Sequence, residues 1–489
     1  MAYTKRSNAA WNKAFSQLDR HKYPRVIQQE KYIQQKFQNN RLLTKAEKDG
    51  LLARLHKHYD LIRIERSIEK RLCTKCIDLC SAAQYCELCV RKYLENNFRN
   101  WSSGNSVIDK LIQECQKEVV ITDSIVEWIE YEQFEDVTYK TEGGCSKIYT
   151  AIWRDGPYHK WNDDTQSLQR FPRDKVVLKK LCNSANSDGN WFQEVKSQFC
   201  IDNTGKYLVR CYGLTKDPIC NDYLLVLNHL NCDLRQYLAE NYSVMTWDKK
   251  YDIIRKLSQR LSKIHQKNFV HRDLHSGNIL YSSRNDDLYI GDMGFCGPID
   301  KQIDNVYGNI PYIAPEVLCG EPHTQKSDVY SLGILMWQIA VGRTPFRYIE
   351  YNDNLVSSIV GGIRPDIHES IPFEYVLIMK QCWDADPKNR PDACEISNRL
   401  NQMLNELRVK ETKQRSPQYA SLNYLNYFIN KTAKKNKNYF ILTPNSETFT
   451  DEHSKLFIAS NMSGPKNATI EEQLGMIFYK INFLMGQRL

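Results

Sequence analysis

The sequence of 489 residues has no long apolar run. No stretch reaches the ~18 residues that a membrane-spanning helix needs, and the longest, around 333–341, is typical of a buried helix. The first residues, Met-Ala-Tyr-Thr-Lys-Arg-Ser-Asn, lack the apolar core of a secretory signal peptide. We therefore expect an intracellular, cytoplasmic protein, with the nucleus as an alternative. Its length allows two to four domains, one of them with a substantial core.

Without a secretion signal, the 16 cysteines are expected to be thiols or metal ligands rather than disulfides. Five of them fall within seventeen residues, at Cys73, Cys76, Cys80, Cys86 and Cys89. Each C-x-x-C pair presents two thiolates from one tight turn, which suits tetrahedral Zn²⁺. We interpret Cys73, Cys76, Cys86 and Cys89 as a structural zinc site and Cys80 as a spare thiol. Free thiols on an amphipathic helix, or a redox pair, are the alternatives.

If zinc is bound, the segment around these cysteines depends on it, because so short a piece cannot bury enough apolar surface alone. Five nearby aliphatic side chains would then pack together against the knuckles. They are Leu72, Ile77, Leu79, Leu88 and Val90.

The net charge of +9 is concentrated near the N-terminus. Residues 1–72 hold 17 Lys/Arg against 7 Asp/Glu, a surplus of +10, so the remainder sums to about −1. Apolar residues in this arm recur at i, i+3, i+4 and i+7, which predicts amphipathic helices. The charge could serve contact with nucleic acid or an acidic surface, or simply solvate helix faces. No signature of a nucleic-acid-binding fold accompanies it, which favours the second interpretation.

A ten-residue stretch, His271 to Leu280, has the sequence H-R-D-L-H-S-G-N-I-L. The order H-R-D-L-x-x-x-N is typical of a phosphoryl-transfer catalytic loop. Asp273 would accept the proton of a substrate hydroxyl, while Asn278 would hold a Mg²⁺ ion on the phosphates of ATP. Fourteen residues beyond Asn278, Asp292 opens an Asp-Met-Gly triplet and would bind the metal as well.

Further motifs follow in a fixed order. They are Ala314-Pro315-Glu316, Ser327-Asp328-Val329-Tyr330-Ser331-Leu332-Gly333, Cys382-Trp383-Asp384 and Arg390-Pro391. With them, residues 130–410 resemble a eukaryotic protein kinase. The run from Ser327 and the Trp and Arg-Pro signature are most similar to the tyrosine-kinase-like group. In detail the chain resembles the expanded kinases of that group in filamentous and mycorrhizal fungi.

The resemblance implies an α+β, two-lobed protein kinase fold, with a small β-rich N-lobe and a large helical C-lobe. A helical N-terminal region with the cysteine knuckle precedes it. We divide the chain into a basic amphipathic helical arm (1–70), the cysteine knuckle (71–95), a helical connector (96–129), the kinase domain (130–410) and a C-terminal tail (411–489). The tail is expected to be partly disordered or to dock as a helix over 470–489.

The N-lobe motifs indicate where ATP would bind. Val176-Val177-Leu178-Lys179 matches the strand whose lysine pairs with the α- and β-phosphates. Lys180 is the alternative, since a slip of one residue turns the side chain to the other face of the strand. Glu194 is the expected ion-pair partner on the helix that kinases call C.

The phosphate-covering loop is short of glycine. Aligned on Ile148, its three glycine positions are Thr141, Gly143 and Ser146, and only Gly143 survives, with Gly144 beside it. We expect a stiffer loop and weaker nucleotide affinity.

At the hinge, the resemblance makes Leu227 the gatekeeper and places backbone groups of Asn228 and Leu230 at the adenine. The residues expected around ATP are therefore Gly143, Gly144, Ile148, Lys179, Leu227, Asn228 and Leu230.

Between Asp292 and Glu316 there is no Ser or Thr, only Tyr307 and Tyr312. Tyr312 lies too close to Ala314 to act as a free switch. We therefore predict a segment that is ordered without phosphorylation or controlled from outside, with Tyr307 as the only local acceptor. Glu316 is expected to form a salt bridge with Arg390.

The resemblance implies an ATP- and Mg²⁺-dependent enzyme that transfers the γ-phosphate to Ser/Thr hydroxyls of a protein substrate. Dual specificity stays open, because His275 and Asn309 stand where Ser/Thr kinases carry Lys and Thr. The alternative is a pseudokinase scaffold, argued from the lost glycines. Retention of Lys179, Asp273 and Asn278, together with Asp292, favours catalysis.

Overall fold

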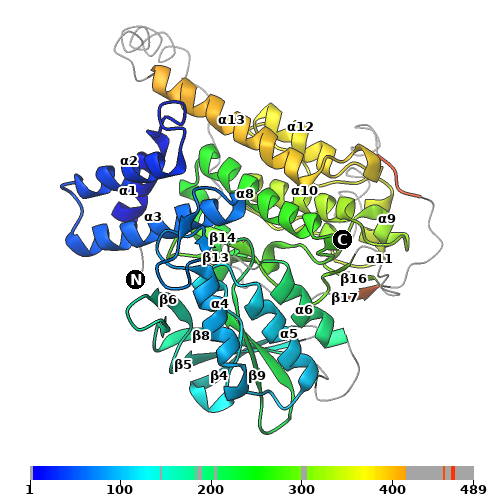
Figure 1. The fold of residues 1–489 in the computed structure, drawn as a ribbon. Helices are drawn as coiled ribbons and strands as arrows, with labels where there is room; N and C mark the ends of the chain where they lie inside the picture. Colours follow the sequence, from blue (N-terminus) through cyan, green and yellow to red (C-terminus); the bar gives the residue numbers. More distant parts are fainter. Residues whose placement is uncertain are drawn as a thin grey trace. The chain divides into compact units, whose positions relative to one another are not determined.

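The computed structural model describes residues 4–143, 146–181, 184, 190–202, 206–298, 306–414, 455–457 and 464–467 (Figure 1). The chain divides into two compact units. The first comprises Met1–Cys232 and Ile279–Gly297, and the second comprises Asp233–Asn278 and Pro298–Leu489. Among the described residues, no helix combines the length and the apolarity that crossing a bilayer would require.

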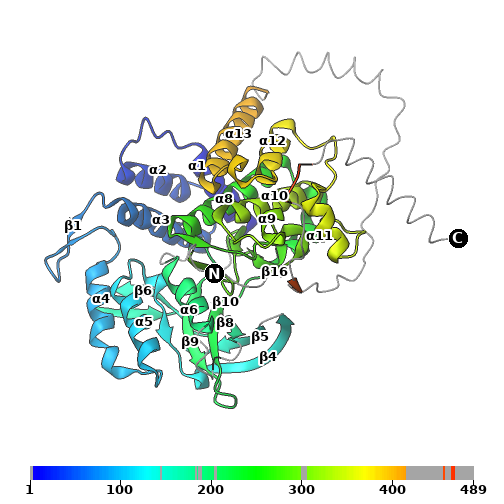
Figure 2. The ribbon, with the colours of Figure 1, turned by 90° about the vertical axis from the view of Figure 1, so that its right-hand side faces the viewer.

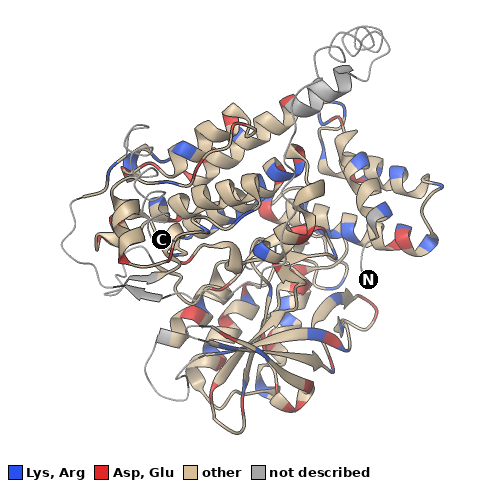
Figure 3. Ribbon diagram, turned by 180° about the vertical axis from the view of Figure 1, so that it is seen from behind, with Lys and Arg blue, Asp and Glu red and all other residues tan. Residues whose placement is uncertain are grey.

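The first unit begins with three helices, α1 (Lys5–Ser16), α2 (Val26–Gln38) and α3 (Lys45–Arg66). The amphipathic helices expected in the arm are therefore present. Thr44 caps α3 in a capping box with Glu47, which satisfies the first backbone N–H groups of the helix. Their shared core consists of Ala14, Val26, Ile33, Phe37, Leu43, Leu51, Leu55 and Tyr59. Lys and Arg recur along the remaining faces of these helices (Figure 3).

The knuckle and the connector follow. Their elements are β1 (Arg71–Leu72), β2 (Leu79–Cys80), α4 (Glu87–Asn96), the 3-10 turn Phe98–Asn100, α5 (Ser106–Lys117), the 3-10 turn Thr122–Ser124 and β3 (Glu127–Trp128). Strands β1 and β2 pair antiparallel. Asn105 caps α5 by accepting from the N–H of Val107, which fixes where this helix starts.

A six-stranded sheet in the order β3-β9-β10-β8-β5-β4 forms the centre of the first unit. Its other strands are β4 (Phe134–Gly143), β5 (Ser146–Trp153), β8 (Asp174–Lys180), β9 (Cys211–Lys216) and β10 (Tyr223–Asn228). Strand β3 pairs parallel to β9, with Glu127 opposite Gly213. Gly213 has φ 147°, and a Cβ there would lie 1.8 Å from the Glu127 carbonyl oxygen. Only glycine permits the N-terminal region to extend the sheet at this edge.

Helix α6 (Asn190–Cys200) packs on this sheet. A hairpin of β6 (Tyr158–Asn162) and β7 (Ser167–Arg170) is inserted between β5 and β8. Its Trp161 and Leu168 bury against Val90 and Leu94 of α4. The hairpin β13 (Ile279–Ser282) and β14 (Asp287–Ile290) also belongs to this unit. The N-terminal region and the sheet thus share cores rather than being separated by a linker.

The second unit is mainly helical. Its longer helices are α7 (Leu234–Asn241), α8 (Trp247–Gln266), α10 (Gln325–Val341), α11 (Asp353–Val360), α12 (Phe373–Cys382) and α13 (Ala393–Gln414). Helix α10 packs against α8 and α12, and α13 against α8 (Figures 1 and 2). A Cβ on Gly333 would lie 2.8 Å from the Cβ of Cys382, so glycine allows α10 and α12 to approach closely.

Shorter elements follow the catalytic loop in this unit. They are β16 (Val306–Gly308), the 3-10 turn Ile310–Tyr312, α9 (Pro315–Leu318), the 3-10 turn Pro387–Asn389 and β17 (Lys455–Phe457). Strand β17, from the tail, pairs antiparallel with β16, with Leu456 opposite Tyr307. The N–H of Lys466 also donates to the Val360 carbonyl oxygen at 2.9 Å. The helix expected over 470–489 lies outside the described residues.

Glu316 and Arg390 form the expected salt bridge. Two parallel hydrogen bonds join Nη1 to Oε1 at 2.6 Å and Nη2 to Oε2 at 2.7 Å, and the Arg390 side chain is fully buried. Arg390 also donates to the Lys326 carbonyl oxygen at 3.0 Å. This prediction from the sequence is confirmed.

Removing Arg390 is therefore expected to leave the Glu316 carboxylate buried without its partner. Arg390→Ala should lower the free energy of unfolding of the second unit by about 3–5 kcal/mol, measured by urea denaturation. The control is Arg399→Ala, which removes a half-exposed i,i+4 partner of Glu395 at 3.7 Å and a hydrogen bond to Gln381 Oε1 at 2.6 Å. It should cost about 1 kcal/mol or less. Equal losses from the two variants would contradict the expectation.

Candidate active site and metal centre

Lys179 is the central cation of the first unit. Its Nζ lies 2.7 Å from Oε1 of Glu194 on α6 and 2.5 Å from Oδ1 of Asp292. The neighbouring Lys180 points the other way and lies 2.9 Å from Asp222. Successive side chains of a strand leave on opposite faces, so the register of β8 selects Lys179 over Lys180. The structure thus brings together three of the predicted catalytic residues.

The electrostatics keep this lysine charged. Burial alone would lower the pKa of Lys179, but the carboxylates of Asp292 and Glu194 raise it above its usual value. The N–H of Gly294 also donates to Asp292 Oδ1 at 3.0 Å. A Cβ at Gly294 would lie 3.0 Å from that oxygen, so a larger residue would push against the carboxylate.

The predicted nucleotide contacts are placed only in part. Ile148 lies opposite Lys179 in the β5–β8 pair, and Gly143 ends β4 opposite Ser146. Gly144 lies outside the described residues. The described residues of this loop lie in β4 and β5, which pair antiparallel.

The hinge follows β10. Leu227, paired with Val177, contributes to the core beneath it, and Leu230 is buried. The N–H of Asn228 already donates to the Arg210 carbonyl oxygen at 2.9 Å. Asn228 would therefore have to offer its carbonyl oxygen, rather than its N–H, to an adenine.

The second unit holds the other predicted catalytic residues. Asn278 Nδ2 donates to the backbone oxygen of Asp273 at 2.8 Å and to its Oδ2 at 3.1 Å. Nε2 of His275 lies 3.5 Å from the same Oδ2. The loop between Asp273 and Asn278 thus turns both side chains to one place. The five predicted catalytic residues fall into two sets, one in each unit.

Asp328, at the start of α10, holds this loop and was not among the predicted site residues. Its two carboxylate oxygens accept from the N–H groups of His271 and Arg272 at 2.8 and 2.9 Å. Burial raises its pKa, but hydrogen bonds from His265 and the loop outweigh burial and lower it. Arg272 adopts φ 71°, a left-handed conformation that this carboxylate supports. In the sequence, the place of Asp328 in the Ser327–Gly333 motif was the only indication of this role.

Between Asp292 and Glu316, Tyr312 is placed as the sequence predicted. Tyr312 is buried, and its hydroxyl donates to Gln338 Oε1 at 2.6 Å and lies 3.2 Å from the Ser276 hydroxyl. A tyrosine with these contacts has a structural role. Tyr307 lies in β16, where its backbone pairs with β17.

The four cysteines of the knuckle converge. The Sγ atoms of Cys73, Cys76, Cys86 and Cys89 all lie within 4.8 Å of one another, and Cys80 is not in the group. Cys73 and Cys89 are 3.8 Å apart, and Cys76 and Cys86 are 3.7 Å apart. With Zn–S bonds of about 2.3 Å, a regular tetrahedron separates its sulfur atoms by about 3.8 Å. The thiol arrangement therefore fits a tetrahedral metal ion.

The pKa values of these thiols shift in opposite directions. Burial raises the pKa of Cys73, but the N–H groups of Cys76 and Lys75 outweigh it and lower the value to about 7. Burial and the Cys76 thiol raise the pKa of Cys89 to about 12. Four thiolates this close repel one another unless a cation lies between them.

The loop between the two C-x-x-C pairs is anchored by charged side chains. Asp60 of α3 accepts from the N–H of Ala83 at 2.7 Å, and Arg71 donates to the Tyr85 carbonyl oxygen at 2.7 Å. Asp60 is itself held by Arg63 at 3.2 Å within the three-helix core. The knuckle is therefore fixed to α3.

The aliphatic cluster expected at the knuckle is wrong for three of its five members. Leu72, Ile77 and Leu79 are 64%, 77% and 59% exposed. Leu88 packs against the buried thiols, and Val90 belongs to the core shared with the β6–β7 hairpin. Polar anchors and the thiols hold the knuckle, so Leu72 of β1, Leu79 of β2 and Ile77 between the strands are left exposed.

Comparison with known proteins agrees with this geometry. The family described as "Protein tyrosine and serine/threonine kinase" matches residues 141–400, more than half of the chain. The two units, a sheet with α6 and a helical unit, fit the two lobes of the kinase fold. The chain belongs to this protein kinase family.

Several relatives are protein kinases by name. The probable serine/threonine-protein kinase roco5 of Dictyostelium discoideum is 24% identical over 56% of this chain and 10% of its own length. A probable LIM domain-containing serine/threonine-protein kinase of the same organism is 28% identical over 59% of this chain and 46% of its own. A putative serine/threonine-protein kinase/receptor of Acanthamoeba polyphaga mimivirus is 30% identical over 32% of this chain and 10% of its own. The chain spans less than half the length of these relatives.

Substituting the two adjacent lysines, Lys179 and Lys180, tests which of them would bind the phosphates of ATP. Lys179→Met should lower the rate of phosphoryl transfer by about 100-fold or more. The substitution removes the Lys179 ammonium group, which Glu194 and Asp292 hold in place for the phosphates. Lys180→Met, which removes the pair with Asp222 and the contact with the Cys220 thiol at 3.0 Å, should leave the rate within about twofold. The rates are measured with labelled ATP, and a larger loss for Lys180→Met would show that the register is wrong.

Proposed function

We propose that this chain is an ATP- and Mg²⁺-dependent protein kinase that phosphorylates Ser/Thr hydroxyls of a protein substrate. The observation that carries the proposal is the buried Lys179, paired at once with Glu194 and Asp292. Pseudokinases need not keep this ion pair, and a scaffold role does not require a desolvated cation between two carboxylates. The shortage of glycines at Thr141 and Ser146 is the argument for a pseudokinase, and we expect it to reduce affinity for ATP rather than abolish transfer.

The roles of the residues follow from their chemistry. Mg²⁺·ATP supplies the phosphoryl group and part of the charge neutralisation. Lys179, oriented by Glu194, would bind the α- and β-phosphates, and Asp292 and Asn278 would bind the metal. Asp273 would orient the substrate hydroxyl and accept its proton. Catalysis by these residues would be mainly positioning and electrostatic stabilisation.

Substrate class and setting are further proposals. Ser/Thr specificity is supported by the names of the relatives, which are serine/threonine-protein kinases, and dual specificity is the alternative. The motifs from Ser327 and around Trp383 support membership of the tyrosine-kinase-like group, with resemblance to its expanded fungal members. An intracellular, cytoplasmic location is in keeping with the absence of disulfide bonds among the 14 described cysteines. Binding of nucleic acid or acidic surfaces by the basic arm is an alternative that no contact favours.

The direct test is autophosphorylation of the full chain with labelled ATP and Mg²⁺. Wild type should incorporate label on Ser/Thr, identified by mass spectrometry. Asp273→Asn should lower the rate by at least about 100-fold, because the substituted amide cannot accept the hydroxyl proton. Equal incorporation in the two proteins would refute catalysis by this chain, and phosphotyrosine as the only product would refute the Ser/Thr assignment.

We also propose that Cys73, Cys76, Cys86 and Cys89 hold a structural Zn²⁺ ion. The support is the tetrahedral spacing of the four Sγ atoms and the anchoring of the intervening loop. Zinc binding supplies folding energy in small metal domains, on the order of 10–16 kcal/mol in peptides.

Metal analysis of the full chain tests the zinc site. Freshly reduced protein should contain one zinc per chain, measured by atomic emission. Cys86→Ser should lose the metal, because three thiolates bind it far more weakly. Cys80→Ser should keep it, since the Cys80 thiol instead lies 3.5 Å from the Arg71 carbonyl oxygen. Protein without metal, or equal losses in both variants, would refute the site.

A further inference from the structure

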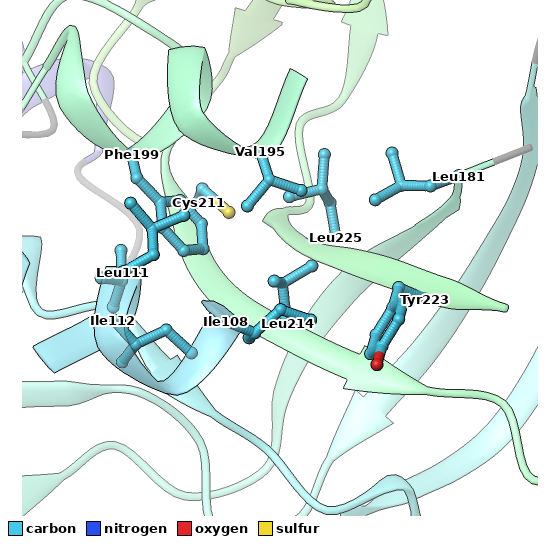
Figure 4. Close-up of a cluster of buried hydrophobic side chains, with 11 residues drawn as sticks. Ile108, Leu111, Ile112, Leu181, Val195, Phe199, Cys211, Leu214, Tyr223 and Leu225 are labelled. Atoms are coloured by element: carbon cyan, nitrogen blue, oxygen red, sulfur yellow. The ribbon is translucent and has the colours of Figure 1, made fainter. Parts of the chain in front are cut away.

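Helix α5 lies before the residues that match the kinase family, yet it shares a core with α6, the helix that carries Glu194. Ile108, Leu111 and Ile112 of α5 face Val195 and Phe199 of α6 (Figure 4). Ile108, Ile112 and Val195 are fully buried. The floor of this cluster is formed by the sheet residues Cys211, Leu214, Tyr223 and Leu225, with Val126 and Leu181 beside them.

The two faces of α6 have different tasks. Val195 and Phe199 are four residues apart and lie on one face, toward α5. Glu194 and Ser197, three residues apart, share another face. Glu194 binds Lys179, and the Ser197 hydroxyl donates to the Cys296 carbonyl oxygen at 3.2 Å, four residues after Asp292. A displacement of α6 would therefore change the ion pair and the metal-binding segment together.

Helix α5 is itself fixed to the sheet. The buried Gln116 side chain donates through Nε2 to the Val126 carbonyl oxygen at 2.7 Å, just before β3. Trp128 of β3 contacts the Tyr223 ring edge-on at 6.4 Å, and Trp191 of α6 stacks on the same ring at 5.0 Å. Strand β3 is hydrogen-bonded to β9. The cluster therefore links α5, β3 and α6 through rigid elements.

A polar contact joins the far ends of the two helices. The Cys115 thiol of α5 hydrogen-bonds the Cys200 thiol of α6, and this contact, with burial, raises the pKa of Cys115 well above its usual value. The helices thus meet along their length, from Ile108 to Cys115.

We propose that α5 is a positioning element for phosphoryl transfer, in which Ile108, Leu111 and Ile112 hold α6 so that Glu194 stays on Lys179. This inference rests on the proposed kinase function and extends it to residues upstream of the family match. The catalytic unit then begins near residue 106. Ile112 touches neither ATP nor substrate in this role and acts only through α6.

The test compares two isoleucines of equal burial. Ile112→Ala removes a side chain from the cluster on α6, and Ile33→Ala removes the same atoms from the α1–α3 core, which contains no α6 residue. Both side chains are 0% exposed, so both variants should lose comparable thermal stability. Ile112→Ala should lower kcat of the full chain by about tenfold, within the usual range of coupling between sites. Ile33→Ala should stay within about twofold, and Ile112→Leu should restore the rate. Equal kcat losses for Ile112→Ala and Ile33→Ala would overturn the proposal.

A double-mutant cycle asks whether Ile112 acts through Glu194. In a Glu194→Gln background, where the ion pair is already lost, Ile112→Ala should change kcat by less than about twofold. Fully additive losses would overturn the proposal. If Ile112→Ala does not fold, Ile112→Val makes the smaller cavity and should show the same pattern at reduced size.

Hydrogen exchange separates this inference from the proposed function. The amides of residues 190–200 should exchange faster in Ile112→Ala than in wild type or Ile33→Ala, whether or not the chain transfers phosphate. A wild type without transfer activity but with this exchange pattern would refute the kinase proposal and support the positioning of α6. Unchanged exchange in Ile112→Ala would refute the positioning.

Discussion

One ammonium group shared by two carboxylates constrains the first unit. Lys179 is buried, and a buried charge without a partner is costly. Its partners come from two other places in the sequence, Glu194 on α6 and Asp292 after β14. Each supporting element must therefore hold its position to keep the charge compensated. Under the proposed function, a phosphate of ATP would take the place of carboxylate oxygens as an acceptor from Lys179.

The N-terminal region takes part in this constraint because it is packed into the same unit. Strand β3 pairs with β9 through the glycine-only contact at Gly213. The inserted β6–β7 hairpin buries Trp161 against α4, and α5 covers α6. The sequence prediction began the kinase domain at residue 130. In the structure, the residues before and after this boundary pack in shared hydrophobic cores.

The cysteine knuckle connects to this packing by a different kind of contact. Asp60, within the ion network of α3, accepts from the backbone of the loop between the C-x-x-C pairs. Tyr85 of that loop packs with Ile125, close to β3. A metal ion that orders the loop would therefore order the junction between the helical arm and the sheet. A metal ion bound there would affect the kinase lobe through packing and not through chemistry.

The sequence by itself determined what depends on short spacing. The spacing of five positions from Asp273 to Asn278 brings both side chains together locally, and the C-x-x-C pairs each form one turn. Strand alternation separates Lys179 from Lys180, although the motif order was needed to say which one faces Glu194. The tertiary structure alone decided the rest. Asp328 holds His271 from fifty-seven residues away, a distance at which no local spacing applies. The sequence predicted a helical connector over 96–129 but not that α6 packs against its helix α5. Local spacing also could not predict that Leu72, Ile77 and Leu79 are exposed. Polar anchors distant in sequence, such as Asp60, fix the knuckle, so it does not depend on packing of these three side chains.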